Sequence, residues 1–330
     1  MKGTTAVRLG ELYQWLLQEG IAADPRSREE VEALLAARKK AVTGSMDKAT
    51  RLADDGQWDN PYGDTRILYG EADREVRRVL AGIDIDGAEL LLADRWRERG
   101  KPIDLVIAHH PAGRALVQLH QVMKVQEDLL AAAGIPINVA EAIMADRIEE
   151  VRRSLLPSNH QKVVDLARLL DIPFLCVHSP ADNKVQRYLS EYLTADRIGP
   201  EKTRTVRDIV DALLDLPEFQ LAAGHGVTPQ VIAGKNDDRA GKIYIKMNGG
   251  TSGPEQSIEA LVKAGVGTMV CMHLPESQRK KAAEAKLRVV IAGHMACDSL
   301  GMNLLLDGLE RQGVEVLSCA GLLRYQRDSA

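Results

Sequence analysis

The chain has 330 residues, of which 45% are hydrophobic and 27% charged, and its formal net charge is −4 at neutral pH. This length can bury a large core, as one big domain or two. The absence of a basic excess and the low aromatic content (4%) do not favour nucleic-acid binding. No apolar run approaches the roughly 18 residues of a membrane helix, and the first residues lack a signal-peptide core. We therefore expect a cytoplasmic protein with no membrane partner, whose 4 cysteines are buried thiols rather than disulfides.

The first 57 residues predict a helical preface. Leucines at 9, 12, 16 and 17 share one stripe of a helix expected over residues 1–23, which Asp24-Pro25 breaks. Ser27 and Glu30 have the spacing of a capping box that starts a second helix. A third, short helix is expected over 46–53, and Gly56 lies among the turn residues that end the preface.

From residue 58 onward, strand and helix patterns alternate, which favours a parallel sheet flanked by helices. Helical periodicity fills 113–170, a segment that would form either an oligomer interface or part of the core. Residues 215–241 read as loop-rich. Strands are predicted at 66–69, 82–86, 103–108, 173–178, 242–247, 266–272, 288–292 and 314–317, the last of which could return to the sheet of the first half. Helices are predicted at 71–80, 87–98, 182–192, 203–214, 255–264, 276–286 and 298–312.

The predicted buried strand 103–108 ends in two histidines. Its apolar run is too short for a free-standing helix and is typical of a strand covered on both faces. His109 and His110 follow directly, and Pro111 cannot continue the ladder. Ligands of open α/β sheets bind beyond the carboxyl ends of the strands, where imidazoles make good metal ligands. The alternative is a pair of histidines that only caps the strand.

Three further predicted strands end in histidine, at His178, His273 and His294. Five of the 8 histidines thus lie at the ends of buried strands, where scattered surface histidines would not collect. Each of these three is followed, three or four residues later, by a carboxylate: Asp182, Glu276 and Asp298, respectively. Imidazole and carboxylate together suit Zn, Fe or Mn without thiolates, so the pattern predicts a metal site.

A glycine-rich segment at 248–253 follows the predicted strand 242–247 and precedes a helix. This arrangement can hold an anion with backbone N–H groups. It lacks the lysine of a P-loop and the spacing of a dinucleotide fingerprint, and a tight turn without a ligand is an equal alternative.

Several motifs occur in a recognisable order: Trp58-Asp-Asn60 with Gly70, Gly82-Ile-Asp84, Ala108-His-His-Pro111, His178-Ser-Pro-Ala-Asp182 and Gly293-His-Met-Ala-Cys-Asp298. In this order they resemble the Nif-three-like dinuclear metal-centre family, some members of which carry the name type 2 GTP cyclohydrolase I. The resemblance covers roughly residues 58–111 and 172–325. It implies an α/β fold of two linked halves with mostly parallel sheets, facing a metal pair and assembled into a ring-shaped homohexamer.

We therefore divide the chain into the preface 1–57, a first half 58–200 with a helical insertion at 113–170, and a second half 201–330. Carried over by position, the resemblance implies that His178 orients a ligand or a water, and that Asp182 is the bridging carboxylate. The implied ligands of two divalent metal ions are His109, His110, Asp182, His294 and Asp298.

The chain departs from the family's pattern at three places. Ser179 stands where the family has Thr, which is a mild change. Asp298 stands where the family has Glu, so its carboxylate is one methylene shorter. Cys271-Met-His273 stands where the family often has Thr-Gly-Glu, and His273 would either replace a carboxylate near the site or cap its strand.

Two cations about 4 Å apart can activate a water and hold both oxygens of a displacement. We therefore predict a metal-dependent hydrolase of a small molecule such as a nucleotide or a phosphoester, with His273 or Glu276 as general base. The alternative is a non-catalytic metal-binding or partner-binding oligomeric ring. A ring that binds DNA would need a basic lining, which the composition does not favour.

Overall fold

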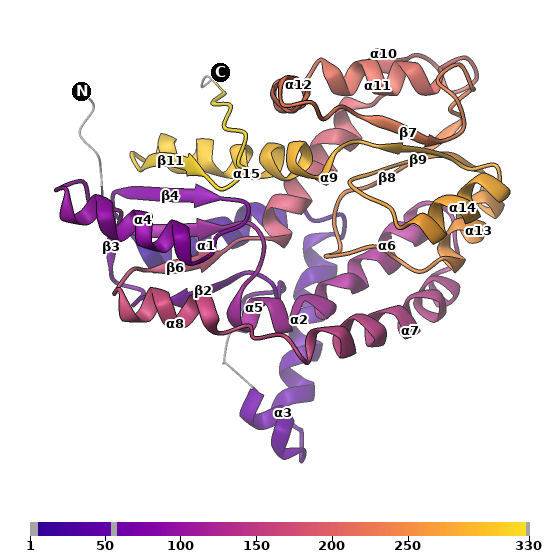
Figure 1. Cartoon of the computed structure of the whole chain (residues 1–330). Helices are drawn as coiled ribbons and strands as arrows, with labels where there is room; N and C mark the ends of the chain where they lie inside the picture. Colours follow the sequence, from indigo (N-terminus) through magenta and orange to yellow (C-terminus); the bar gives the residue numbers. More distant parts are fainter. Residues whose placement is uncertain (1–5, 54–57, 328–330) are drawn as a thin grey trace.

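Two mixed, mostly parallel sheets organise the chain, and the computed structural model describes residues 6–53 and 58–327. The first sheet has the strand order β11-β4-β5-β6-β2, and the second has the order β7-β10-β9-β8. Figure 1 shows the two sheets and the helices around them. A separate short pair joins β1 to β3. The strands are β1 (Val7–Arg8), β2 (Arg66–Tyr69), β3 (Glu75–Val76), β4 (Arg78–Gly82), β5 (Leu105–Ala108), β6 (Phe174–Cys176), β7 (Gln230–Ala233), β8 (Lys242–Lys246), β9 (Val266–Cys271), β10 (Arg288–Ile291) and β11 (Glu315–Cys319).

Helices flank both sheets. They are α1 (Leu9–Ala22), α2 (Arg28–Thr43), α3 (Lys48–Ala53), α4 (Gly87–Glu98), α5 (Gly113–Val117), the 3-10 helix η1 (Leu119–Lys124), α6 (Val125–Ala132), α7 (Ile137–Leu155), α8 (Lys162–Leu169), α9 (Ser179–Tyr192), α10 (Ala195–Ile198), α11 (Val206–Leu214), α12 (Pro217–Gly224), α13 (Gln256–Lys263), α14 (Glu276–Glu284) and α15 (His294–Arg311). None of the helices in the described ranges is long and apolar enough to cross a membrane.

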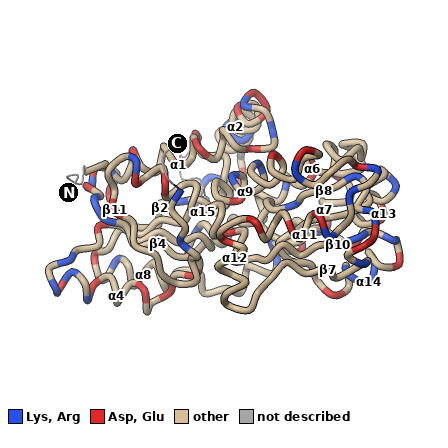
Figure 2. Tube along the Cα trace, turned by 90° about the horizontal axis from the view of Figure 1, so that it is seen from above, with Lys and Arg blue, Asp and Glu red and all other residues tan. Residues whose placement is uncertain are grey.

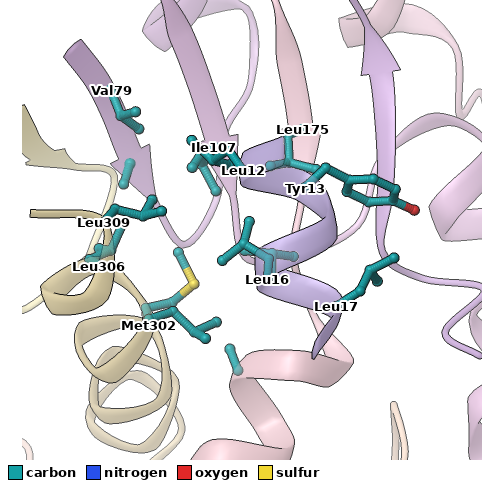
Figure 3. Packing of buried hydrophobic residues seen from close by; sticks show 14 of the residues in the cluster. Leu12, Tyr13, Leu16, Leu17, Val79, Ile107, Leu175, Met302, Leu306 and Leu309 are labelled. Carbon is teal, nitrogen blue, oxygen red and sulfur yellow. The ribbon is translucent and has the colours of Figure 1, made fainter. Parts of the chain in front are cut away.

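Side chains of the first sheet alternate between two cores, as a strand covered on both faces requires. Val79, Ile107 and Leu175 point toward α1 and α15, where they meet Leu16 and Leu309 (Figure 3). The neighbouring strand positions point the other way and pack against α4, α5 and α8. The leucine stripe predicted for the first helix is therefore confirmed as one layer of this core.

The second sheet is also covered on both faces. Val270 and Val290 pack against α9, α11, α12 and α15. Met269 and Val289 pack on the opposite face against a cluster that includes Met144 of α7. Most of the helical segment 113–170 thus belongs to the cores, since η1, α6 and α7 cover the second sheet while α5 and α8 cover the first.

The final strand lies in the first sheet rather than in the second. β11 pairs in parallel with β4, with Val316 opposite Val79 and Leu317 opposite Leu80. The expectation that the last strand returns to the first-half sheet is confirmed, so the chain crosses between the sheets twice. α9 and α15 make these crossings, and each contributes side chains to a core of the first sheet and a core of the second.

Three local predictions are wrong. The helix predicted at 71–80 is instead β3 and most of β4, because Val76 pairs with Val7 of β1 and Val79 and Leu80 fill opposite faces of the sheet. Of the strand predicted at 82–86, only Gly82 lies in the sheet, as the last residue of β4, and Asp86 forms the capping box of α4. The loop-rich segment 215–241 contains α12 and β7.

Other local signals are confirmed. Ser27 and Glu30 make the predicted capping box. The helices expected at 182–192 and 298–312 exist but begin earlier, at Ser179 and His294. Gly56 and the first five residues of the expected helix 1–23 lie outside the described residues.

The α9–α15 crossing depends on a glycine. A β-carbon added to Gly301 of α15 would lie far inside van der Waals contact of the backbone oxygen of Ala181 in α9. We expect Gly301→Ala to lower the free energy of unfolding by about 2–3 kcal/mol, because the added methyl forces the two helices apart. Chemical denaturation of the variant measures this change.

Gly224→Ala at the end of α12 is the matched control, since a β-carbon there meets nothing within 4 Å. We expect its free energy of unfolding to stay within about 0.5 kcal/mol of the parent protein. An equally small change for Gly301→Ala would contradict the close packing of the two helices.

Charged residues of both signs alternate along the trace. Figure 2 shows Lys and Arg interspersed with Asp and Glu over most elements. Many of them form surface ion pairs within one helix, such as Arg152 with Glu149 and Arg187 with Glu191. The interspersed charges agree with the near-neutral composition.

Candidate metal centre

Segments distant in sequence bring imidazoles and carboxylates together between the two sheets. β5 and β6 are parallel neighbours of the first sheet, so the residues that follow them meet at the same edge. β10 of the second sheet ends just before Gly293, and α15 begins at His294. The residues that follow these three strands therefore form one polar cluster.

His109 is fully buried, and its tautomer is fixed by the backbone. Nδ1 lies 3.2 Å from the carbonyl oxygen of Val177, which can only accept, so this nitrogen carries the proton. Nε2 then presents its lone pair toward Oδ1 of Asp182 and Oδ1 of Asp298, each 3.6 Å away. Burial lowers the pKa of His109 to about 4, so the ring is neutral at physiological pH. A neutral imidazole is the form that binds metals.

His110 and His294 approach the other oxygen of the same aspartate. Nε2 of each ring lies 3.4 Å from Oδ2 of Asp298. His294 and Asp298 are one turn apart at the start of α15, which places both side chains on the same face of the helix. Asp298 is therefore the carboxylate that faces imidazoles from both sheets.

His178 and Asp182 come from the junction of β6 and α9. Nδ1 of His178 lies 2.8 Å from Oδ2 of Asp64 and 3.9 Å from Oδ2 of Asp182. The ring of His178 lies beside that of His109 in a tilted arrangement, with centroids 4.8 Å apart. The hydroxyl of Ser179 donates to the same oxygen of Asp64 at 2.8 Å.

The cluster contains polar atoms that no described residue satisfies. Nε2 of His109, Oδ1 of Asp182 and both carboxylate oxygens of Asp298 are buried without a hydrogen-bond partner among the described residues. Unsatisfied buried polar atoms are costly, and several of them converging at one place fit the coordination of a cation. Three sets of side chains have ligand atoms within 4.8 Å of one another: His109–His110–His178, His110–His294–Asp298 and His109–Asp182–Asp298. These donors fit divalent metal ions of the Zn, Fe or Mn type.

The electrostatics of the two aspartates differ. Burial raises the pKa of Asp182 to about 7, and the carboxylates of Asp298 and Asp64 add to this effect. Burial has the same tendency at Asp298, but His109, His110 and His294 outweigh it and hold its pKa well below its usual range. Two carboxylates forced into one buried site repel each other, and a bound cation relieves that repulsion.

The remaining two predicted site residues, His273 and Glu276, lie outside the three sets of ligand atoms. His273 follows β9, its Nδ1 lies 3.2 Å from Oγ of Ser252, and its ring is 5.0 Å from that of His294. It lines the same cavity as Asp182 and Asp298 but belongs to none of the three ligand sets. Glu276 begins α14, where its exposed carboxylate pairs with Arg279 at 2.7 Å. It belongs to none of the ligand sets and does not line the cavity.

Two carboxylates that support the histidines were not predicted as site residues. Oδ1 of Asp84 lies 2.7 Å from Nδ1 of His110, and Asp64 holds His178 as described above. Asp84 follows β4, the sheet neighbour of β5, and Asp64 precedes the antiparallel strand β2. Both therefore lie at the edge where β5 and β6 end. The position of Gly82-Ile-Asp84 directly after an apolar run could have indicated that Asp84 lies at this edge of the sheet.

The Asp84→Ala variant tests this support. Carboxylates that orient metal-binding histidines typically contribute 10- to 100-fold in affinity. Because the Asp84 side chain is 70% exposed, we expect a weakening near the lower limit, about tenfold, with little change in stability. Competition with a chromophoric chelator measures the affinity. Asp73→Ala, on an exposed turn, is the control, and equal affinities for both variants would contradict an orienting role of Asp84.

A solved structure described as a NIF3 superfamily protein from Sphaerobacter thermophilus superimposes on this chain with a TM-score of 0.71 and 29% sequence identity. The match covers 88% of this chain and 98% of that one. The resemblance to the NIF3 superfamily is confirmed. The α/β fold class is confirmed with it, because the superposition covers most of both chains.

Two further solved structures match the NIF3-like chain at lower similarity. Reduced HcgD from Methanocaldococcus jannaschii has a TM-score of 0.47 and 16% identity, and covers 76% of this chain and 87% of its own. TTHA1606 from Thermus thermophilus has a TM-score of 0.45 and 18% identity, and the match covers 92% of this chain and 100% of that one. No protein-family model and no curated protein matches the chain.

Proposed function

We propose that this NIF3-like protein holds a pair of divalent metal ions and hydrolyses a small molecule such as a nucleotide or a phosphoester. The observation that carries the proposal is the sharing of ligands between the sets. Asp298 belongs to two of the three sets, and so do His109 and His110. Two metal ions bound close together usually share a ligand, and Asp298 is placed to be shared by two sets.

The proposed positions follow from the clusters. His109, Asp182 and Asp298 would hold one ion, and His110, His294 and Asp298 the other. His178, fixed by Asp64, would orient Asp182 or a water molecule. A bound metal pair supplies Lewis acidity, which activates a water and stabilises the charge that develops on the leaving oxygen.

His273 is the proposed proton acceptor. Burial, together with the neighbouring His294 and Lys246, lowers the pKa of His273 to about 4, so its ring is neutral at physiological pH. A neutral ring at the cavity wall can accept a proton from an attacking water. Glu276 is not part of this proposal, because Arg279 pairs with its exposed carboxylate.

Metal analysis followed by an activity panel tests the proposed function. Protein purified without added metal is expected to contain about two divalent cations per chain and to hydrolyse at least one member of a nucleotide and phosphoester panel. Asp182→Asn is expected to reduce that rate at least about 100-fold, whereas Asp211→Asn on the exposed face of α11 is expected to leave it unchanged. Stoichiometric metal without turnover of any panel member would contradict the hydrolase and support a non-catalytic metal-binding ring.

We also propose that the protein works in the cytoplasm as a ring-shaped homohexamer, as the family resemblance implies. Support comes from α2 and α3, which form an arm that projects from the body (Figure 1). The arm exposes apolar side chains, with Met46 88% and Leu52 75% exposed, and a partner subunit would cover them. All four cysteines are free, which suits a reducing compartment. Light scattering after gel filtration measures the mass of the assembly, and a monomer would contradict the ring.

A further inference from the structure

The end of β8 brings two polar side chains to the metal cavity that belong to none of the ligand sets. Lys246 is the last residue of the strand, and Asn248 follows two positions later. Both line the cavity that Asp182, His273 and Asp298 also line. Their chemistry therefore bears on what the cavity binds beside the metal ions.

Lys246 brings an ammonium group to a cavity whose ligands are imidazoles and carboxylates. Its Nζ donates to the carbonyl oxygen of Thr251 at 2.9 Å, which orders the side chain and uses one of its three donors. Among the described residues that line this cavity, Lys246 is the single lysine or arginine. Since no carboxylate lies within ion-pair distance of Nζ in the described chain, its charge is available to an anion.

Asn248 is buried, and its orientation follows from its neighbours. Asn183 donates through Nδ2 to the carbonyl oxygen of Gly20, so the oxygen of the Asn183 amide is the atom that faces Asn248. Asn248 must therefore donate through its own Nδ2, at 2.9 Å. Its Oδ1 is left buried without a hydrogen-bond partner among the described residues. A ligand with an O–H or N–H group would satisfy this acceptor.

We propose that the metal cavity binds a phosphate-type oxyanion, with the ammonium group of Lys246 holding one anionic oxygen and Oδ1 of Asn248 accepting from a neighbouring O–H or N–H donor. This inference rests on the proposed function, because it assigns the substrate class of the same site. It narrows the substrate to a phosphoester or another phosphorylated small molecule. An uncharged substrate would leave the Lys246 charge without a role.

Calorimetric titration of inorganic phosphate into the metal-loaded protein at neutral pH tests the inference. We expect the dissociation constant of phosphate to rise about tenfold in Lys246→Gln, because a charge-assisted hydrogen bond is lost. The uncharged variant Lys246→Met, of nearly equal length, is expected to show the same loss and serves if the glutamine variant does not fold. The metal content is expected to equal that of the parent protein in both.

Lys242→Gln is the matched control. Lys242 lies on the same strand and also donates to a backbone oxygen, that of Ala133 at 2.6 Å, but it does not line the metal cavity. Its phosphate affinity is expected to match that of the parent protein. Equal affinities for the parent, both Lys246 variants and the control would overturn the inference, as would the absence of phosphate binding to the parent. Failure of the hydrolase proposal is a separate result, since it shows as missing turnover while the Lys246-dependent binding persists.

Discussion

The Asp298→Asn variant is expected to lose at least about 100-fold in metal affinity, the largest effect of any single substitution in the site. The reason is its central position. Oδ1 of Asp298 faces His109 at 3.6 Å, and Oδ2 faces His110 and His294 at 3.4 Å each. Replacing one oxygen with an amide group removes the charge from both proposed metal positions at once. Elemental analysis and chelator competition measure the loss.

The size of this effect distinguishes a shared ligand from an ordinary one. Asp298→Asn keeps the shape of the side chain, so the variant is expected to fold. Asp211→Asn makes the same chemical change on a surface helix and is expected to retain the full metal content. If Asp298→Asn retained both ions at normal affinity, neither position would depend on this carboxylate, and the proposed arrangement would be wrong.

Removal of the metal ions is expected to lower the melting temperature by roughly 10 °C. Each of two ions present at about a thousand times its dissociation constant stabilises the folded state by about 4 kcal/mol. With an unfolding entropy of about 2.1 cal/mol/K per residue, a change of 1 kcal/mol shifts the midpoint of a 330-residue chain by about 1.4 °C. The apo protein also leaves the buried oxygens of Asp182 and Asp298 unsatisfied. Thermal unfolding with and without a chelator measures the shift.

The chelator experiment has an internal control. Asp298→Asn, which is expected to bind the ions weakly, should show a shift of less than about 3 °C on chelation. Restoring the metal to the chelated parent protein should restore its melting temperature. A parent protein whose melting temperature is the same with and without chelator would show that the polar cluster is satisfied without a cation.

The sequence predicted the strands that carry strong local signals. β5, β6 and β9 are short apolar runs buried on both faces, and runs of this length are typical of buried strands because a helix is usually longer. The segment 71–80 was predicted wrongly because its two short strands are set by distant partners. Val76 pairs with Val7, and Val79 pairs with both Leu105 and Val316. Pairing across more than two hundred residues leaves no local pattern in the sequence.

The candidate ligands could be found because each of these histidines lies within three residues of the end of a strand. The direction in which a side chain points depends on how its strand or helix is placed in the fold, and the sequence pattern did not predict it. Glu276 follows His273 by three residues, close to the four that separate Asp298 from His294, yet α14 turns its carboxylate outward to Arg279. Asp64 precedes its strand instead of following it, and only the antiparallel direction of β2 places it beside His178.

The return of β11 to the first sheet has a consequence for synthesis on the ribosome. Arg78 and Glu315, which pair across β4 and β11, are 237 positions apart in the chain. The early strands emerge long before their last neighbour, and α15, which carries His294 and Asp298, emerges shortly before that strand. A nascent chain therefore cannot complete its first sheet until translation has passed β11, and the proposed metal ligands His294 and Asp298 become available only when α15 has emerged, late in synthesis.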